Sequence, residues 1–316
     1  MQGFLKTKPA FNQFLILISV VLVSFFVLGL IGTLVLSSVT GIGITEMSDM
    51  SKVDFTKPGA INFLRGMQFV QFISLFVVPT LICTWLFSGN RKKYLWLKQP
   101  VHPGFFISGV GLMLIAIPFT NWLGQLNQNI PFPSGMEKWM KMQEDEAAET
   151  IRALLSRQTL SDLFLNIFFI AGLAAVGEEL LFRGMAQRLL IKIFKSPWAG
   201  IIISAAIFSA MHMQFYGFLP RFALGILLGA IYWYSGSLWV AILAHFIYDT
   251  VLIVLAWFYP EMLNDENKLP ITGLAMAGTI SLALVTLLLI WMKKRTSTTY
   301  EAVYADDAVP VKDNPF

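Results

Sequence analysis

Residues 163–187 read LFLNIFFIAGLAAVGEELLFRGMAQ, an apolar run that is interrupted past its middle by two adjacent carboxylates and an arginine. A stretch of this length can cross a membrane, because about 20 mostly apolar residues span the hydrocarbon core. Each ionisable group at that depth costs about 2.5 to 3.5 kcal/mol on insertion scales. Glu178, Glu179 and Arg183 therefore predict a polar site inside a membrane protein.

The composition of the whole chain supports a membrane protein. Hydrophobic residues make up 56% of the 316 residues and charged residues only 13%, whereas about a quarter of a soluble domain is charged. We predict an all-α fold, a polytopic membrane bundle of about eight transmembrane helices. The expected spans are residues 11–37, 61–88, 104–125, 163–190, 198–215, 219–235, 238–257 and 270–292.

The basic residues predict the orientation of the bundle. The net charge is +4, but lysine and arginine lie in short clusters between apolar runs instead of one basic patch, which excludes a nucleic-acid partner. With eight spans, all four clusters fall on one side of the membrane. The positive-inside rule makes this side cytoplasmic, and both termini are expected there too. Short loops and the absence of a eukaryotic targeting signal favour a bacterial inner membrane. The clusters are Lys6 with Lys8, Arg91 to Lys98, Arg188 to Lys195, and Lys293 to Arg295.

The chain divides into four predicted regions. Residues 1–160 hold N-terminal transmembrane helices and an amphipathic helix at 134–158, read as lying on the outer leaflet or, alternatively, as a lid over a site. Residues 161–257 form a helical core that carries the polar residues. Residues 258–295 hold the last transmembrane helix, and the polar segment 296–316 is expected to be a disordered cytoplasmic tail.

Helical geometry separates the two carboxylates. Glu179 and Arg183 are four residues apart, so they share a face and can form an ion pair. Glu178 is rotated by about 100° from Glu179 and lies off that face. Glu178 is therefore left for another task, such as that of a general base.

Two of the three histidines lie in the same half of the chain. His245 and Asp249 are also four apart, so Asp249 can accept a hydrogen bond from the imidazole and fix its tautomer. His212 falls near the end of the expected fifth span. Either ion pair alone could simply join two helices; both pairs together with His212 favour a polar site in the bundle.

Three motifs in this half resemble those of a known family. EELLFR (178–183) has the form E-E-x-x-x-R, FSAMH (208–212) has the form F-x-x-x-H, and HFIYD (245–249) has the form H-x-x-x-N/D. In this order, on successive apolar segments, they are similar to the motifs of the CAAX prenyl protease and bacteriocin-processing (CPBP, or Abi) family. The resemblance covers residues 160–255.

The resemblance implies an intramembrane endopeptidase that acts on a membrane-associated or lipid-modified peptide. It gives Glu178 the role of activating water, with His212 helping to hold that water, and makes His245 and Asp249 the pair that stabilises the oxyanion. Glu179, Arg183 and Phe208 would support the site. Many relatives have asparagine at position 249, so either a protonated Asp249 donates to the oxyanion or His245 donates alone.

The same residues allow other chemistry and other functions. Glu178, His212 and His245 are also a possible zinc ligand set. No H-E-x-x-H motif is present, and the three residues come from separate expected helices. The resemblance implies a glutamate peptidase without a metal, which is the favoured interpretation. A non-catalytic immunity or scaffold protein of the same family is the first alternative function. A proton-coupled transporter that uses the same residues as a relay is the second.

Overall fold

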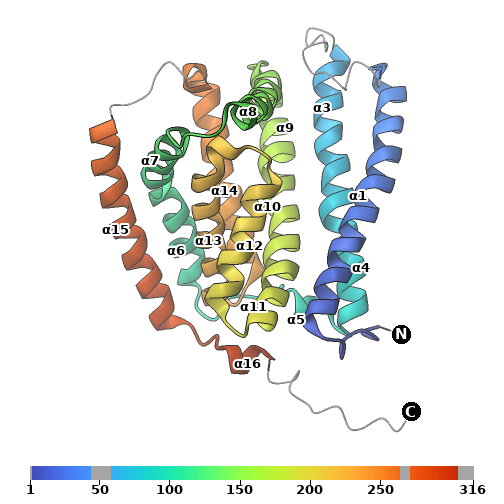
Figure 1. The fold of residues 1–316 in the computed structure, drawn as a ribbon, viewed down its shortest axis with the longest axis vertical. Helices are drawn as coiled ribbons and strands as arrows, with labels where there is room; N and C mark the ends of the chain where they lie inside the picture. Colours follow the sequence, from blue (N-terminus) through green and yellow to red (C-terminus); the bar gives the residue numbers. More distant parts are fainter. Residues whose placement is uncertain (1, 44–57, 264–270, 305–316) are drawn as a thin grey trace.

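The computed structural model describes residues 2–43, 58–263 and 271–304 and confirms the all-α fold (Figure 1). Seven helices of the described chain are long and apolar enough to cross a membrane, which makes the chain an integral membrane protein. They are Ala10–Thr40, Gly59–Phe87, Gly104–Gln128, Leu160–Phe194, Phe215–Ser235, Leu238–Phe258 and Thr272–Arg295.

The fifth expected span, residues 198–215, is shorter than predicted. α12 (Pro197–Met211) has 15 residues, so it is about 22 Å long against a hydrocarbon core of about 30 Å. The helix starts with Ser196, whose side chain accepts from Ala199 N, and with Pro197 at its first position. It ends at Met211 because the chain turns at Met213, which has a φ of 59°.

The N-terminal helices form a pair at one side of the bundle (Figure 1). α1 packs against the long helix made of α3, η2 and α4 and against α11. Many of the apolar side chains of α1, such as Phe26 and Val39, are exposed, which suits a helix that faces lipid. The bounds are α1 (Ala10–Thr40), α3 (Pro58–Gln71), η2 (Phe72–Val77, π-helical), α4 (Val78–Phe87) and α5 (Arg91–Tyr94).

The next helices comprise one crossing of the bundle and one helix at its end. α6 (Gly104–Ile115) and α7 (Ile117–Gln128) form one crossing, and α8 (Ser134–Leu155) lies across one end of the bundle (Figure 1). α8 is the amphipathic helix expected at 134–158. Its apolar residues Met140, Leu154 and Leu155 are buried, and it packs against α3, α9 and η5.

The helix that carries the two glutamates changes its winding several times. Pure α-helix alternates with π-helical segments, in which backbone bonds join residues five apart and which are frequent at functional sites. α14 lies against this helix and against α6 and α13. The bounds are α9 (Leu160–Asn166), η3 (Ile167–Gly172), α10 (Leu173–Glu178), η4 (Glu179–Gln187), α11 (Arg188–Phe194), η5 (Phe215–Gly217), α13 (Phe218–Ser235) and α14 (Leu238–Phe258).

The described part of the expected tail, residues 296–304, contains a short helix. After η6 (Pro260–Leu263) and α15 (Ile271–Arg295), the short helix α16 (Tyr300–Tyr304) packs back onto the bundle. The Tyr304 hydroxyl donates to the Arg188 carbonyl over 2.8 Å, and burial raises the pKa of Tyr304 above its usual value. Residues 305–316 of the expected tail lie outside the described residues.

The basic clusters gather at one end of the bundle. The N-terminus, α5, the end of α11 and the end of α15 all lie at the lower end in Figure 1, opposite α8. This arrangement is the one that the positive-inside rule requires of a single membrane face. The assignment of that face to the cytoplasm stays a prediction.

A buried ion pair joins the N-terminal helices to the core. Arg65 of α3 donates from Nη2 to Asp162 Oδ1 over 2.8 Å and to Asn166 Oδ1 over 2.9 Å. Asn166 in turn donates to the Leu154 carbonyl of α8, and Thr159 donates to the other oxygen of Asp162. Arg65 is 4% exposed, so the pair holds α3, α8 and α9 together away from water.

We expect Arg65→Met to destabilise the protein by about 3 to 5 kcal/mol, because it leaves Asp162 buried without its cation. Thermal unfolding of the purified protein in detergent measures the change. Asn62→Leu, at an exposed position of the same helix, is the control and leaves the melting temperature near that of wild type. An Arg65→Met protein that melts with wild type would show that the pair does not hold these helices.

Candidate active site

The predicted pair of Glu179 and Arg183 is present and forms the centre of the polar cluster. Arg183 Nη1 donates to Glu179 Oε1 over 2.6 Å, and both side chains are almost fully buried, at 1% and 0% exposed. The two residues lie in the π-helical segment η4 and still meet. Arg183 Nη2 also donates to the Gly225 carbonyl of α13, so the guanidinium joins two helices.

Glu179 has a second partner that the sequence did not predict. Its Oε1 lies 2.9 Å from His245 Nδ1 of α14. Since an ionised carboxylate only accepts hydrogen bonds, His245 Nδ1 donates in this contact. One buried oxygen thus positions Arg183 and His245 together, and no spacing within one helix could reveal a contact between residues 66 positions apart.

The other ring nitrogen of His245 faces the remaining carboxylates. Nε2 lies 3.2 Å from Asp249 Oδ2, so the predicted pair of these residues is present, and 3.9 Å from Glu178 Oε2. A hydrogen bond at 3.2 Å needs one proton, carried by the imidazole or by the carboxyl group of Asp249. A proton held between His245 and Asp249 therefore lies near Glu178, whichever of the two residues carries it.

Phe208 of α12 lies between the buried arginine and His212. The Arg183 guanidinium carbon is 4.9 Å from the centre of the Phe208 ring, a distance typical of a cation–π contact. The ring also meets the His212 imidazole edge to face, with centroids 4.9 Å apart. The aromatic residue of the second motif thus links α12 to the Glu179 cluster.

His212 is not joined directly to the carboxylates. Its Nδ1 lies 2.9 Å from the Phe208 carbonyl of the preceding turn. The turn that follows is held from other helices. Arg221 donates to the side chain and the carbonyl of Gln214, and Asn127 Nδ2 of α7 donates to the Phe215 carbonyl.

Glu178 lies at the edge of a small polar pocket. Its side chain is 15% exposed, and the pocket beside it has a volume of about 30 Å³. The polar lining comes from Gln68 and Gln71 of α3, two residues that the sequence analysis passed over. The signal that could have found them is visible: Arg65, Gln68 and Gln71 follow one another at intervals of three in a largely apolar helix.

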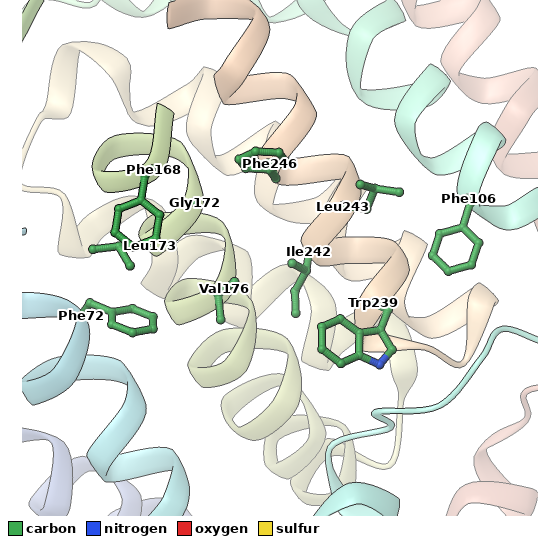
Figure 2. Close-up of a pocket in the computed structure, with 10 residues that line it drawn as sticks. All are labelled: Phe72, Phe106, Phe168, Gly172, Leu173, Val176, Trp239, Ile242, Leu243 and Phe246. Atoms are coloured by element: carbon green, nitrogen blue, oxygen red, sulfur yellow. The ribbon is translucent and has the colours of Figure 1, made fainter. Parts of the chain in front are cut away.

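A larger apolar groove adjoins this pocket. It has a volume of about 500 Å³ and lies between η2, α6, the η3–α10 helix and α14. Phe72 and Leu173 line both hollows, so the groove leads toward Glu178. Figure 2 shows the lining side chains, which are Phe72, Phe106, Phe168, Gly172, Leu173, Val176, Trp239, Ile242, Leu243 and Phe246.

The proposed zinc ligands do not form a metal site. Among the residues that the structure describes, no group of three or more histidine, cysteine, aspartate and glutamate side chains could hold a metal ion. The histidine geometry gives the reason: one ring nitrogen of His245 faces Glu179 and the other faces Asp249. His212 Nδ1 is directed at the Phe208 carbonyl.

Comparisons with known proteins concern this part of the chain. Residues 160–251 match the Rce1-like family, described as type II CAAX prenyl endopeptidase Rce1-like. The chain is similar to the uncharacterized protein YpbD of Bacillus subtilis, with 34% identity over 90 residues. This stretch is 27% of the chain and 43% of YpbD, so the chain spans less than half the length of this relative. No solved structure gives a significant match.

The matched segment begins at α9 and ends within α14, and it holds the two glutamates, Arg183, both site histidines and Asp249. The polar cluster and the sequence match thus coincide. Residues 160–251 of this integral membrane protein form an Rce1-like domain of the type II CAAX prenyl endopeptidase (CPBP, or Abi) family.

Proposed function

We propose that the protein is an intramembrane endopeptidase that hydrolyses a peptide bond in a membrane-associated, lipid-modified peptide, with Glu178 as the general base. The observation that carries this proposal is the division of labour between the two adjacent carboxylates. Glu179 is fully buried and bonded to Arg183 and His245, whereas Glu178 is partly exposed and lines a polar pocket. Of these two carboxylates, Glu178 is the one whose surroundings leave room for a water molecule.

The proposed reaction has two steps. Glu178 takes a proton from water while the water oxygen attacks the carbonyl carbon of the peptide bond. The donor between His245 Nε2 and Asp249 lies 3.9 Å from Glu178 on the imidazole side and stabilises the oxyanion that forms. Glu178 then passes its proton to the leaving amine as the carbon–nitrogen bond breaks.

The apolar groove supports a lipid-modified substrate. Its walls are helices, whose backbone groups are already paired, so an extended peptide placed there would leave its own backbone groups without partners. A hydrocarbon chain has no such groups. In the proposed complex the lipid chain lies in the groove and brings the peptide to Glu178.

The proposed location is the inner membrane of a bacterium, with the end that carries the basic clusters in the cytoplasm. The similarity to a Bacillus subtilis protein supports a bacterial setting. The common position of the N-terminus, α5, the end of α11 and the end of α15 supports the orientation.

We expect Glu178→Gln to lower kcat by about 10²- to 10⁴-fold, the usual contribution of a general base, without lowering the melting temperature. Cleavage of a quenched fluorescent farnesylated peptide by purified protein in liposomes measures kcat. A second measurement detects substrates other than this peptide. It compares the peptides released from membranes that carry the wild-type protein with those released from membranes that carry Glu178→Gln. Glu146→Gln, an exposed carboxylate of α8, is the control. If every peptide released by wild type is also released by Glu178→Gln, the chain is not a peptidase of this kind.

Glu179→Gln should behave differently from Glu178→Gln, because it leaves the buried Arg183 without its anion. We expect a loss of about 3 to 5 kcal/mol in unfolding free energy, seen as a lower melting temperature in detergent. Equal stability of the two variants would contradict the separate roles given to these carboxylates.

Chelation should leave the activity intact, because the polar cluster does not provide a metal site in the described residues. Cleavage rates after dialysis against EDTA are expected to equal those of untreated protein. Loss of activity that returns on addition of zinc would replace the glutamate mechanism by a metal-dependent one.

Gly172→Phe should raise KM for the farnesylated peptide with little cost in stability. Gly172 lines the groove, and the nearest atoms to an added Cβ are 3.6 Å and 3.9 Å away, so the fold accepts a side chain that then fills the groove. Gly111→Phe is the control, since Gly111 also has open space around it and does not line the groove. An unchanged KM in Gly172→Phe would remove the groove from the substrate site.

A further inference from the structure

About half of the residues that line the polar pocket beside Glu178 belong to a helix outside the Rce1-like domain. Gln68 and Gln71 belong to α3, about 90 residues before the matched segment begins. They lie near the middle of the membrane span Gly59–Phe87. An amide at that depth is costly unless it finds a hydrogen-bond partner, so their common position at the pocket needs an explanation.

The packing around Gly177 brings α3 and η2 close to Glu178. A Cβ at Gly177 would lie 2.7 Å from Phe76 and 3.0 Å from Phe72, both in η2. Only a residue without a side chain permits this approach. Glu178, the next residue, lines the same pocket as Gln68 and Gln71 of α3, with Phe72 and Phe76 as apolar walls.

The size and chemistry of the pocket fit water. Its volume is about 30 Å³, and a water molecule needs roughly 10 to 15 Å³ measured in this way and two to four polar partners. Glu178 and the two amides provide that number of partners. The apolar groove beside the pocket lacks them, because its lining is apolar and aromatic.

We propose that Gln68 and Gln71 hold the water molecule that Glu178 deprotonates, an inference that rests on the proposed peptidase function. One hydrogen of the water is directed to the Glu178 carboxylate and the other to an amide oxygen. A lone pair of the water oxygen then remains free for the carbonyl carbon. When Glu178 takes its proton, the hydroxide adds to that carbon, and the amide keeps the other hydrogen bonded throughout.

The inference assigns a catalytic contribution to the N-terminal helices. The matched segment supplies the base and the oxyanion donor, while α3 completes the water site. A purely structural role for the two glutamines predicts instead that their replacement lowers stability and leaves the turnover of the folded enzyme unchanged.

The kinetic test uses Gln68→Met and Gln71→Met, which keep similar side-chain length and remove the amide. The substrate is chosen from the peptides that wild-type membranes release and Glu178→Gln membranes do not release. The most abundant of these peptides identifies a precursor, and a synthetic copy of that precursor is used. We expect kcat to fall about 10- to 100-fold for the loss of one hydrogen bond to the reacting water, with KM nearly unchanged. Gln68→His, which keeps a donor and an acceptor, should recover part of kcat.

Asn62→Leu is the matched control, since it replaces an exposed amide on the same helix. Melting temperatures of all variants separate folding from turnover. If the double variant Gln68→Met, Gln71→Met keeps wild-type kcat while Glu178→Gln has none, the water-holding role is wrong and the peptidase function stands. If Glu178→Gln itself cleaves, the peptidase function fails first.

A structure of the full chain in lipid nanodiscs, at a resolution that shows ordered water, tests the site without any substrate. We expect a water peak within hydrogen-bond distance of the Glu178 carboxylate and of at least one of the two amides. A lipid chain in the pocket, or amide groups that bond only to the protein, would overturn the inference.

Discussion

A single buried carboxylate oxygen organises this site. Glu179 Oε1 accepts from Arg183 over 2.6 Å and from His245 over 2.9 Å, and Arg183 extends to the Gly225 carbonyl and to the Phe208 ring. Four helical segments, η4, α12, α13 and α14, therefore meet at one charge that is shielded from water. Such a charge is tolerated only because its partners are complete, and the same partners fix the imidazole that faces Glu178. Glu179 and Glu178 are neighbours in sequence but differ in environment, since Glu179 is fully buried in this cluster and Glu178 lines a polar pocket.

Close approach of helices positions the rest of the site. η4 begins at Glu179, directly after Glu178, and the change of winding there alters the directions of the side chains that follow. Gly177 lets η2 pack against α10, which brings the amides of α3 to the pocket of Glu178. The Arg65 ion pair holds α3 in that position from one end. The N-terminal helices thus form part of the wall of the candidate site and are held there by specific polar contacts.

Much of this arrangement could be predicted from the sequence, and the reasons for success and failure are physical. Apolar runs report membrane helices directly, because the bilayer imposes a minimum length. Pairs four apart, such as Glu179 with Arg183 and His245 with Asp249, follow from the helical repeat. The contact between Glu179 and His245 depends on how two helices pack, which no local pattern encodes. Gln68 and Gln71 were missed for a different reason: their spacing was visible, but uncharged amides stand out less than charges in an apolar run. The early end of α12 comes with a left-handed turn at Met213 and a contact from Arg221 to Gln214. The helix at the end of the described chain contacts Arg188 through Tyr304.

The short length of α12 has a consequence for the surrounding bilayer. Trp198 and Ile202 are exposed on this helix, so lipid tails contact a segment about 8 Å shorter than the hydrocarbon core. Lipids adapt to such hydrophobic mismatch by thinning locally, at a cost of a fraction of a kcal/mol per ångström. Headgroups and their hydration would then lie deeper beside His212 than elsewhere around the protein. Local thinning of this kind would shorten the path of a peptide backbone from the aqueous phase to Glu178 and Glu179.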